Sequence, residues 1–187
     1  MGRIEDLANR YQNHISAPWQ KNLAGAQRKI FIFYDKSDER KLRAKLDLFE
    51  MGTRQAGHNW KLFDFTTIFA QWMAAMEYRD AYFEIPGDLT LKLQGDFVHY
   101  SAEKLRKNLL DTDVNETTVV AVAGVASLFG FTKVSLILKE IEQDIRGRLL
   151  LFFPGEYENN NCRLLGARDG WNYLAVPITL HNEVNSQ

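Results

Sequence analysis

Arg148-Leu149-Leu150-Leu151-Phe152-Phe153, followed at once by Pro154-Gly155, is the stretch that decides the fold of this chain. An apolar run of this length that does not alternate with polar residues is typical of a β-strand buried on both faces. Such strands lie in the middle of mostly parallel sheets that helices cover on both sides. We expect Pro154-Gly155 to end the strand and residues 156–161 to form a polar loop beyond its carboxyl end, where ligands and partners of open α/β sheets bind.

Strand patterns and helix patterns alternate along the rest of the chain. Apolar and β-branched stretches predict further strands at 29–34, 60–65, 118–123 and 174–176. Apolar residues at helical spacing predict helices at 3–16, 38–56 and 98–111, and two more over 68–76 and 134–141. This alternation indicates βαβ units. We therefore predict an α/β fold with a mainly parallel, Rossmann-like sheet of about five strands, flanked by helices on both faces, with Pro177 marking an edge strand.

The predicted helices carry further expectations. The helix at 3–16 is amphipathic, and we expect its apolar face to pack on the body of the protein, with partner binding as the alternative. We expect the charged residues of the helix at 38–56, Arg43 among them, to be solvated, and Thr66 to cap the helix after the second predicted strand. Glu84 to Asp88 are expected to form a turn. The chain is predicted to be a single domain, 1–187, with residues 1–17 as its N-terminal helix.

The composition is that of an ordinary globular protein. The chain has 187 residues, 45% of them hydrophobic and 25% charged, which is enough to bury a core without a disulfide or a metal. A formal net charge of −1 does not indicate a dedicated nucleic-acid-binding protein, although a local basic patch stays possible. Because the chain has one cysteine and no apolar run long enough to cross a bilayer, we expect a cytoplasmic protein without an internal disulfide.

Motifs of known catalytic chemistries are missing from the sequence. Residues 124–130 lie between a predicted strand and a predicted helix, where phosphate-binding loops occur, but they lack the Gly-Lys-Ser/Thr ending of a Walker loop. We interpret them as a tight turn of small residues. The four histidines and Cys162 show neither metal-ligand spacing nor a positioned base. We therefore predict no catalytic residue, no metal site and no cofactor.

Two alternative functions remain open at this point. Asp35, Asp64 and Glu156 lie at or just past the ends of predicted strands, so they have the placement needed to meet at one edge of the sheet. There they could bind a divalent metal, which would make the protein a divergent metal-dependent phosphate-handling enzyme or a nucleotide-binding protein. Acidic residues at strand ends are also common loop residues and helix caps. The other alternative is a DNA contact made by the basic residues of the helix at 38–56.

Arginine, aromatic and acidic residues gather after the central strand. Arginine, tryptophan and tyrosine are enriched at the energetic centres of protein interfaces. We therefore consider the following residues candidates for partner binding: Glu156, Tyr157, Glu158, Arg168, Asp169 and Trp171. In the alternative interpretation, Arg168 pairs with Asp169 and Trp171 covers the edge of the sheet.

Three segments resemble a known family. They are TVVAVAGVASLFG at 118–130, RGRLLLFFPGEYENN at 146–160 and GWNY at 170–173, with weaker likeness at 31–35 and 56–58. Together they are similar to BrxB of the bacteriophage exclusion (BREX) defence systems, and the resemblance covers essentially the whole chain.

The resemblance implies a role in phage defence. BREX systems combine an adenine-specific DNA methyltransferase, an alkaline-phosphatase-like protein called PglZ, a large ATPase and small accessory proteins, of which BrxB is one. The family carries no established catalytic motif, so no catalytic residue is transferred to this sequence. The resemblance therefore implies a non-enzymatic adaptor that binds other BREX proteins, with PglZ as the first candidate and the ATPase or methyltransferase as others.

Overall fold

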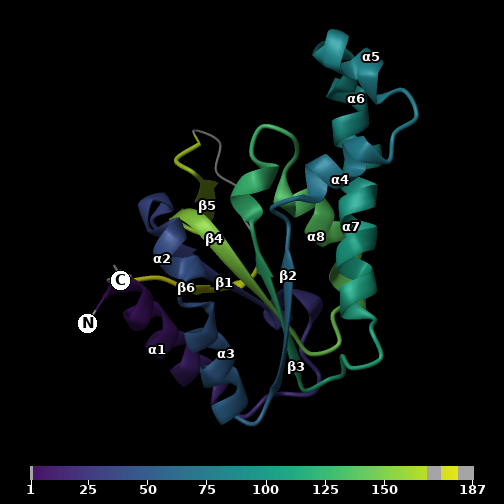
Figure 1. Cartoon of the computed structure of the whole chain (residues 1–187). Coiled ribbons are helices and arrows are strands. Elements are labelled where there is room, and N and C mark those ends of the chain that lie inside the picture. Colours follow the sequence, from purple (N-terminus) through teal and green to yellow (C-terminus); the bar gives the residue numbers. More distant parts are fainter. Residues whose placement is uncertain (1, 168–173, 181–187) are drawn as a thin grey trace.

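A central sheet lies between two layers of helices (Figure 1). This computed structural model describes residues 2–167 and 174–180. The strands are β1 (Lys29–Tyr34), β2 (Asn59–Asp64), β3 (Thr118–Ala123), β4 (Arg148–Glu158), β5 (Asn161–Leu164) and β6 (Val176–Ile178). Their order is β2-β3-β4-β1-β6 with parallel pairing throughout, and β5 pairs antiparallel with the far end of β4. The predicted α/β fold is confirmed.

The helices cover the two faces of the sheet unequally. One layer contains α1 (Arg3–Ile15), α2 (Glu39–Arg43) and α3 (Leu46–Gln55). The other contains α4 (Ile68–Ala74), α7 (Asp96–Leu109) and α8 (Val134–Ile141). Two short helices, α5 (Arg79–Glu84) and α6 (Leu89–Gln94), extend beyond the sheet past the N-terminal end of α7 (Figure 1). Turns of 3-10 helix lie at Gly25–Arg28, Lys36–Asp38, Pro86–Asp88, Val125–Leu128 and Glu142–Asp144.

The central strand β4 explains why its sequence is apolar without a break. Leu149, Leu151 and Phe153 point into the core beneath α7 and α8, and Leu150 and Phe152 point into the core beneath α1 and α3. All five side chains are fully buried. Because both faces of the strand are covered, successive residues alternate between two apolar environments instead of between core and water.

The prediction that Pro154-Gly155 ends this strand is wrong. β4 continues to Glu158, and its last residues pair with β5 as a hairpin. Residues 156–161 therefore belong to this hairpin and do not form a polar loop. Pro154 is the last residue of β4 in register with β1, and Gly155 is the first to pair with β5. A Cβ atom on Gly155 would lie 2.0 Å from the carbonyl oxygen of Arg163. The Pro-Gly pair therefore marks the change from parallel to antiparallel pairing.

Helix boundaries account for the other differences from prediction. The helix expected at 38–56 is two helices, because the chain turns at Ala44 and Lys45. Thr66 does not cap α4; the residue before that helix is Thr67, whose side chain makes no capping hydrogen bond. The turn expected from Glu84 to Asp88 is the end of α5 followed by a 3-10 turn at Pro86–Asp88.

The N-terminal helix α1 is packed against the sheet and α3. Its residues Ile4, Leu7, Tyr11 and Ile15 are buried in the same core as β1 and β4. The hydroxyl of Tyr11 lies 2.6 Å from that of Thr53 on α3, and the Tyr11 ring packs on the ring of Phe49. The apolar face of α1 is thus used inside the protein.

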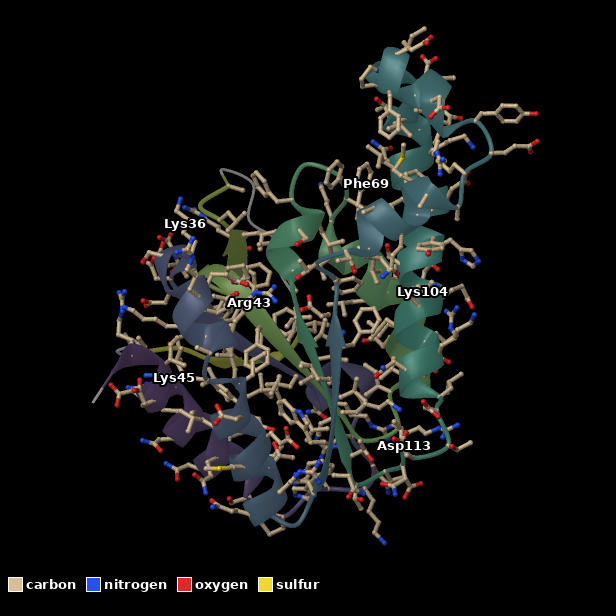
Figure 2. All side chains as sticks on the ribbon, in the orientation of Figure 1. Lys36, Arg43, Lys45, Phe69, Lys104 and Asp113 are labelled. Atoms are coloured by element: carbon tan, nitrogen blue, oxygen red, sulfur yellow. The ribbon has the colours of Figure 1, made fainter. Side chains whose placement is uncertain are left out.

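Both outer strands of the sheet carry a residue that disfavours further strand pairing. Along β2, Lys61 sits mid-strand, and its ammonium group binds Asp111 at 2.7 Å and Asp113 at 2.6 Å (Figure 2 labels Asp113). At the other edge, β6 contains Pro177, which has no N–H to donate. The predicted edge position of the Pro177 strand is confirmed.

Candidate partner-binding surfaces

A helical projection, residues 77–96, stands out from the body of the protein (Figure 1). Pro86 cannot continue α5, so the chain turns there and runs back through α6 into α7. Within 77–96 the structure buries one residue, Leu89. The projection therefore presents nearly all of its side chains to solvent.

Several of these exposed side chains are large and apolar. Tyr78 is 71% exposed, Phe83 65%, Ile85 59% and Leu91 84%. Each apolar Å² left in water forgoes about 25 cal/mol, so a group of such residues on one substructure is typical of a surface that a partner covers. Phe83 also lines a groove of about 390 Å³ together with Phe69, Ala70 and Met73 of α4.

Aromatic stacking fixes the base of the projection. Phe69 stacks on Phe131 with ring centroids 3.9 Å apart, and it meets the ring of Phe97 edge-on at 5.6 Å (Figure 2 labels Phe69). Trp72 packs on Phe97 at 5.0 Å. The methionine and aromatic residues of 68–76 are therefore packing residues, and they hold the groove in place.

The hairpin of β4 and β5 carries three of the residues that the sequence suggested for partner binding. Glu156 and Glu158 are exposed on it. Tyr157 is half-buried: its ring packs on Phe33 at 5.2 Å, and its hydroxyl donates to Asn160 Oδ1 at 2.9 Å. The other three candidates, Arg168, Asp169 and Trp171, lie outside the described residues.

The acidic residues at the strand ends are engaged separately. Asp35 accepts hydrogen bonds from the backbone and hydroxyl of Ser37. Asp64 binds Arg43 and Thr66, and Glu156 lies on the hairpin opposite Arg163. No three His, Cys, Asp or Glu residues come together as a possible metal site within 2–167 and 174–180.

Arg43 organises the carboxyl edge of β2. It binds Asp64 at 2.9 Å, Thr66 Oγ1 at 2.7 Å and Glu39 at 2.7 Å, so the prediction of a merely solvated charge is wrong (Figure 2). Burial raises the pKa of Asp64, but hydrogen bonds from Thr66 and Arg43 outweigh burial and hold that pKa below its usual value.

Gly124 begins the loop that resembled a phosphate-binding loop by position. Its φ is +75°, and a Cβ atom would lie 2.2 Å from Asp64 Oδ1 and 2.7 Å from the backbone nitrogen of Thr66. Val125 and Leu128 of the adjoining turn are buried. The close approach that this glycine permits is made to the Asp64–Thr66 turn, in agreement with the interpretation as a tight turn.

These features define an α/β protein whose helical projection exposes several large apolar side chains, and whose described residues hold no group of three His, Cys, Asp or Glu side chains placed to bind a metal. The model of the family described as BREX protein BrxB matches residues 66–178, which is more than half of the chain. The chain therefore belongs to the BrxB family and is a component of a BREX phage-defence system. The matched region includes both the projection and the hairpin.

The other comparisons add no relative: neither the curated proteins nor the solved structures gave a match. Among the helices described, none has the length and apolar character needed to cross a membrane.

The projection was not predicted from the sequence because its helices are short and carry no continuous apolar stripe. A signal was nevertheless present: Tyr78, Phe83, Ile85 and Leu91 lie close together in a segment with no amphipathic pattern that would bury them.

Proposed function

We propose that this protein is a non-enzymatic adaptor of its BREX system that binds other BREX proteins, with the PglZ-like protein as the first partner. The observation that carries the proposal is the exposure of Tyr78, Phe83, Ile85 and Leu91 on one projecting substructure. Family membership supplies the set of partners among which the adaptor acts.

The projection is suited to this role because its contacts leave its outer side free. Its base is held by Phe69, Trp72 and Phe97, whereas the exposed residues beyond that base make no part of either core. Large apolar side chains that a helix presents together form strong contact points for a partner. The groove beside Phe83 fits an apolar side chain of the partner.

Co-purification with each BREX protein of the same system, expressed one at a time, tests the proposal. We expect the tagged wild type to retain the PglZ-like protein and the double variant Phe83→Asp, Leu91→Asp to lose it. Met51→Asp is the matched control, because Met51 is also an exposed apolar residue but lies on α3 in the other helical layer. Retention of none of the BREX proteins by the wild type would contradict the adaptor role.

The hairpin is the second candidate surface, and the same experiment separates it from the projection. The double variant Glu156→Lys, Glu158→Lys reverses two exposed charges without touching either core. If this variant loses the partner and the projection variant keeps it, the adaptor role stands and the binding surface is the hairpin.

A further inference from the structure

A cavity opens at the edge of the sheet where the parallel strands begin, opposite to the edge where Arg43 and Asp64 lie. Its volume is about 910 Å³. The loop after α1 contributes Trp19 and Lys21, and the residues just before or at the start of the strands contribute Arg28, His58 and Arg148. Loops before β3 and β4 complete the wall with Glu116 and Arg146, among others.

Arg148 is the buried cation of this cavity. It is 8% exposed, its guanidinium lies 4.4 Å from the centre of the Trp19 ring, and Trp19 in turn stacks on His58 at 3.7 Å. Its Nη1 donates to the carbonyl of Gly147 at 3.1 Å. No carboxylate of residues 2–167 or 174–180 forms an ion pair with it.

The neighbouring arginines donate hydrogen bonds to backbone carbonyl groups and have further N–H groups that these bonds do not use. Arg28 Nη1 donates to the carbonyl of Ile145 at 2.8 Å, and Arg146 Nη1 donates to that of Val114 at 3.0 Å. Arg28 Nε is buried and has no hydrogen-bond partner in the part of the chain that is described. Carbonyl oxygens orient these guanidinium groups but do not neutralise their charge.

A neighbouring buried cation, in contrast, has a counter-charge. Lys29, one residue along from Arg28, is also buried, yet it binds Glu142 at 2.7 Å. Burial, and after it the charge of Arg28, lowers the pKa of Arg148. Burial is also the main cause of the lowered pKa values of His14 and His58, and the charge of Arg148 lowers both further. The positive charge of the cavity thus acts on both histidines, and neither of them offsets it.

We infer that this cavity binds the phosphate group of a small phosphorylated ligand, with Arg28 and Arg148 as the residues that contact the anion. A buried, unpaired cation is destabilising, and an oxyanion seated on it removes that penalty. Guanidinium groups match phosphate in charge and in the spacing of their donors. The volume lies within the range of about 300–1,000 Å³ that is typical of small-molecule sites.

A small ligand fits the observations better than a nucleic acid. The arginines line a cavity instead of an exposed stripe, and the chain as a whole has a formal charge of −1. Glu116 is exposed on the rim of the cavity, where it would repel a continuous phosphate backbone. The site is independent of the adaptor role, because it lies at the start of β4, at the opposite end of that strand from the hairpin, and shares no residue with the projection.

Thermal unfolding in phosphate-free buffer tests the inference, with inorganic phosphate and pyrophosphate as the probes and sodium chloride at equal ionic strength as the baseline. We expect pyrophosphate at about 10 mM to raise the Tm of the wild type by roughly 2–4 °C above the chloride baseline. In Arg148→Gln we expect that rise to vanish, each protein being compared with its own baseline. Arg54→Gln, which removes an exposed arginine on α3, is expected to keep the full rise.

A second variant keeps the test decisive should Arg148→Gln fold poorly. Lys21 lies on the exposed part of the wall, so Lys21→Gln leaves the core untouched and is expected to weaken pyrophosphate binding several-fold in calorimetric titration. No Tm rise with either anion in the wild type overturns the inference. So does a response to duplex DNA that depends on Arg148 without any response to phosphate or pyrophosphate.

Discussion

At the scale of single residues, Gly124 holds the Asp64–Thr66 turn against the start of the loop after β3. Gly57 offers a matched comparison: its φ is +85°, but an added Cβ would meet nothing within 4 Å. We expect Gly57→Ala to lower the free energy of unfolding by about 1 kcal/mol, from backbone strain alone. Gly124→Ala adds steric overlap, so we expect about 3 kcal/mol. Urea denaturation measures both, and equal losses would show that the close approach to Asp64 is unimportant.

Asp64 makes stability depend on pH. Its pKa in the folded protein is lower than the ordinary value of 3.8, so the folded state favours the ionised form. The stability that it contributes is present above the unfolded pKa and is lost as the pH falls through the folded pKa. We expect Asp64→Asn to have a lower Tm than the wild type at pH 6, and we expect this difference in Tm to become smaller below a pH of about 4. Asp80→Asn, which removes an exposed carboxylate, should show no such convergence.

Residue-scale interactions were the hardest part to predict. Arg43 meets Asp64 across 21 positions of sequence, and Arg148 meets Trp19 across a much larger separation. A charge that binds a distant partner has the same sequence pattern as a solvated one. The arginine cluster was therefore not predicted, whereas the buried run after Arg148 was evident from its local composition.

At the scale of elements, strands were predicted well because burial on both faces leaves a local signature. The predicted bounds of β1 and β3 are confirmed to the residue. The hairpin of β4 and β5 was not predicted because Pro-Gly usually ends a strand. Its signal lay further on: Asn159 and Asn160 both have positive φ, as the two-residue turn of a hairpin requires, and Cys162 and Leu164 alternate with polar residues.

The docking of α1 makes a prediction about this element. Tyr11 is fully buried between α3 and the sheet, so Tyr11→Ala is expected to lower the free energy of unfolding by about 3–5 kcal/mol. Tyr11→Phe keeps the ring and loses the hydrogen bond with Thr53, for an expected loss of about 1 kcal/mol. Chemical denaturation followed by fluorescence measures both values. Small, similar losses would mean that α1 contributes little to the fold.

At the scale of the whole molecule, stability is expected to be uneven. The strands β3 and β4 lie between two cores, whereas the projection has one buried residue in 77–96. We expect amide hydrogens of α5 and α6 to exchange through local opening and those of β3 and β4 only through global unfolding. Hydrogen exchange with mass spectrometry measures this difference. Addition of the PglZ-like partner should slow exchange in the projection; unchanged exchange there would place the partner elsewhere.

The two proposed surfaces lie on separate elements, and this separation is itself testable. Arg148→Gln is expected to retain the PglZ-like protein in co-purification, because the cavity at the start of the strands shares no residue with the projection. The double variant Phe83→Asp, Leu91→Asp is expected to keep the Tm rise with pyrophosphate. Loss of both properties in either variant would indicate coupling between the two surfaces.

Lys61 and Pro177 limit how another chain can dock on the two margins of the sheet formed by β2 and β6. A free strand edge lets a second chain dock through its main chain, a mode that reads little of the partner's sequence. A charge midway along β2 and a missing donor in β6 make that mode unfavourable at both margins of the sheet. We therefore expect that any contact another protein makes at these two margins is made through side chains, which can change without disturbing the sheet.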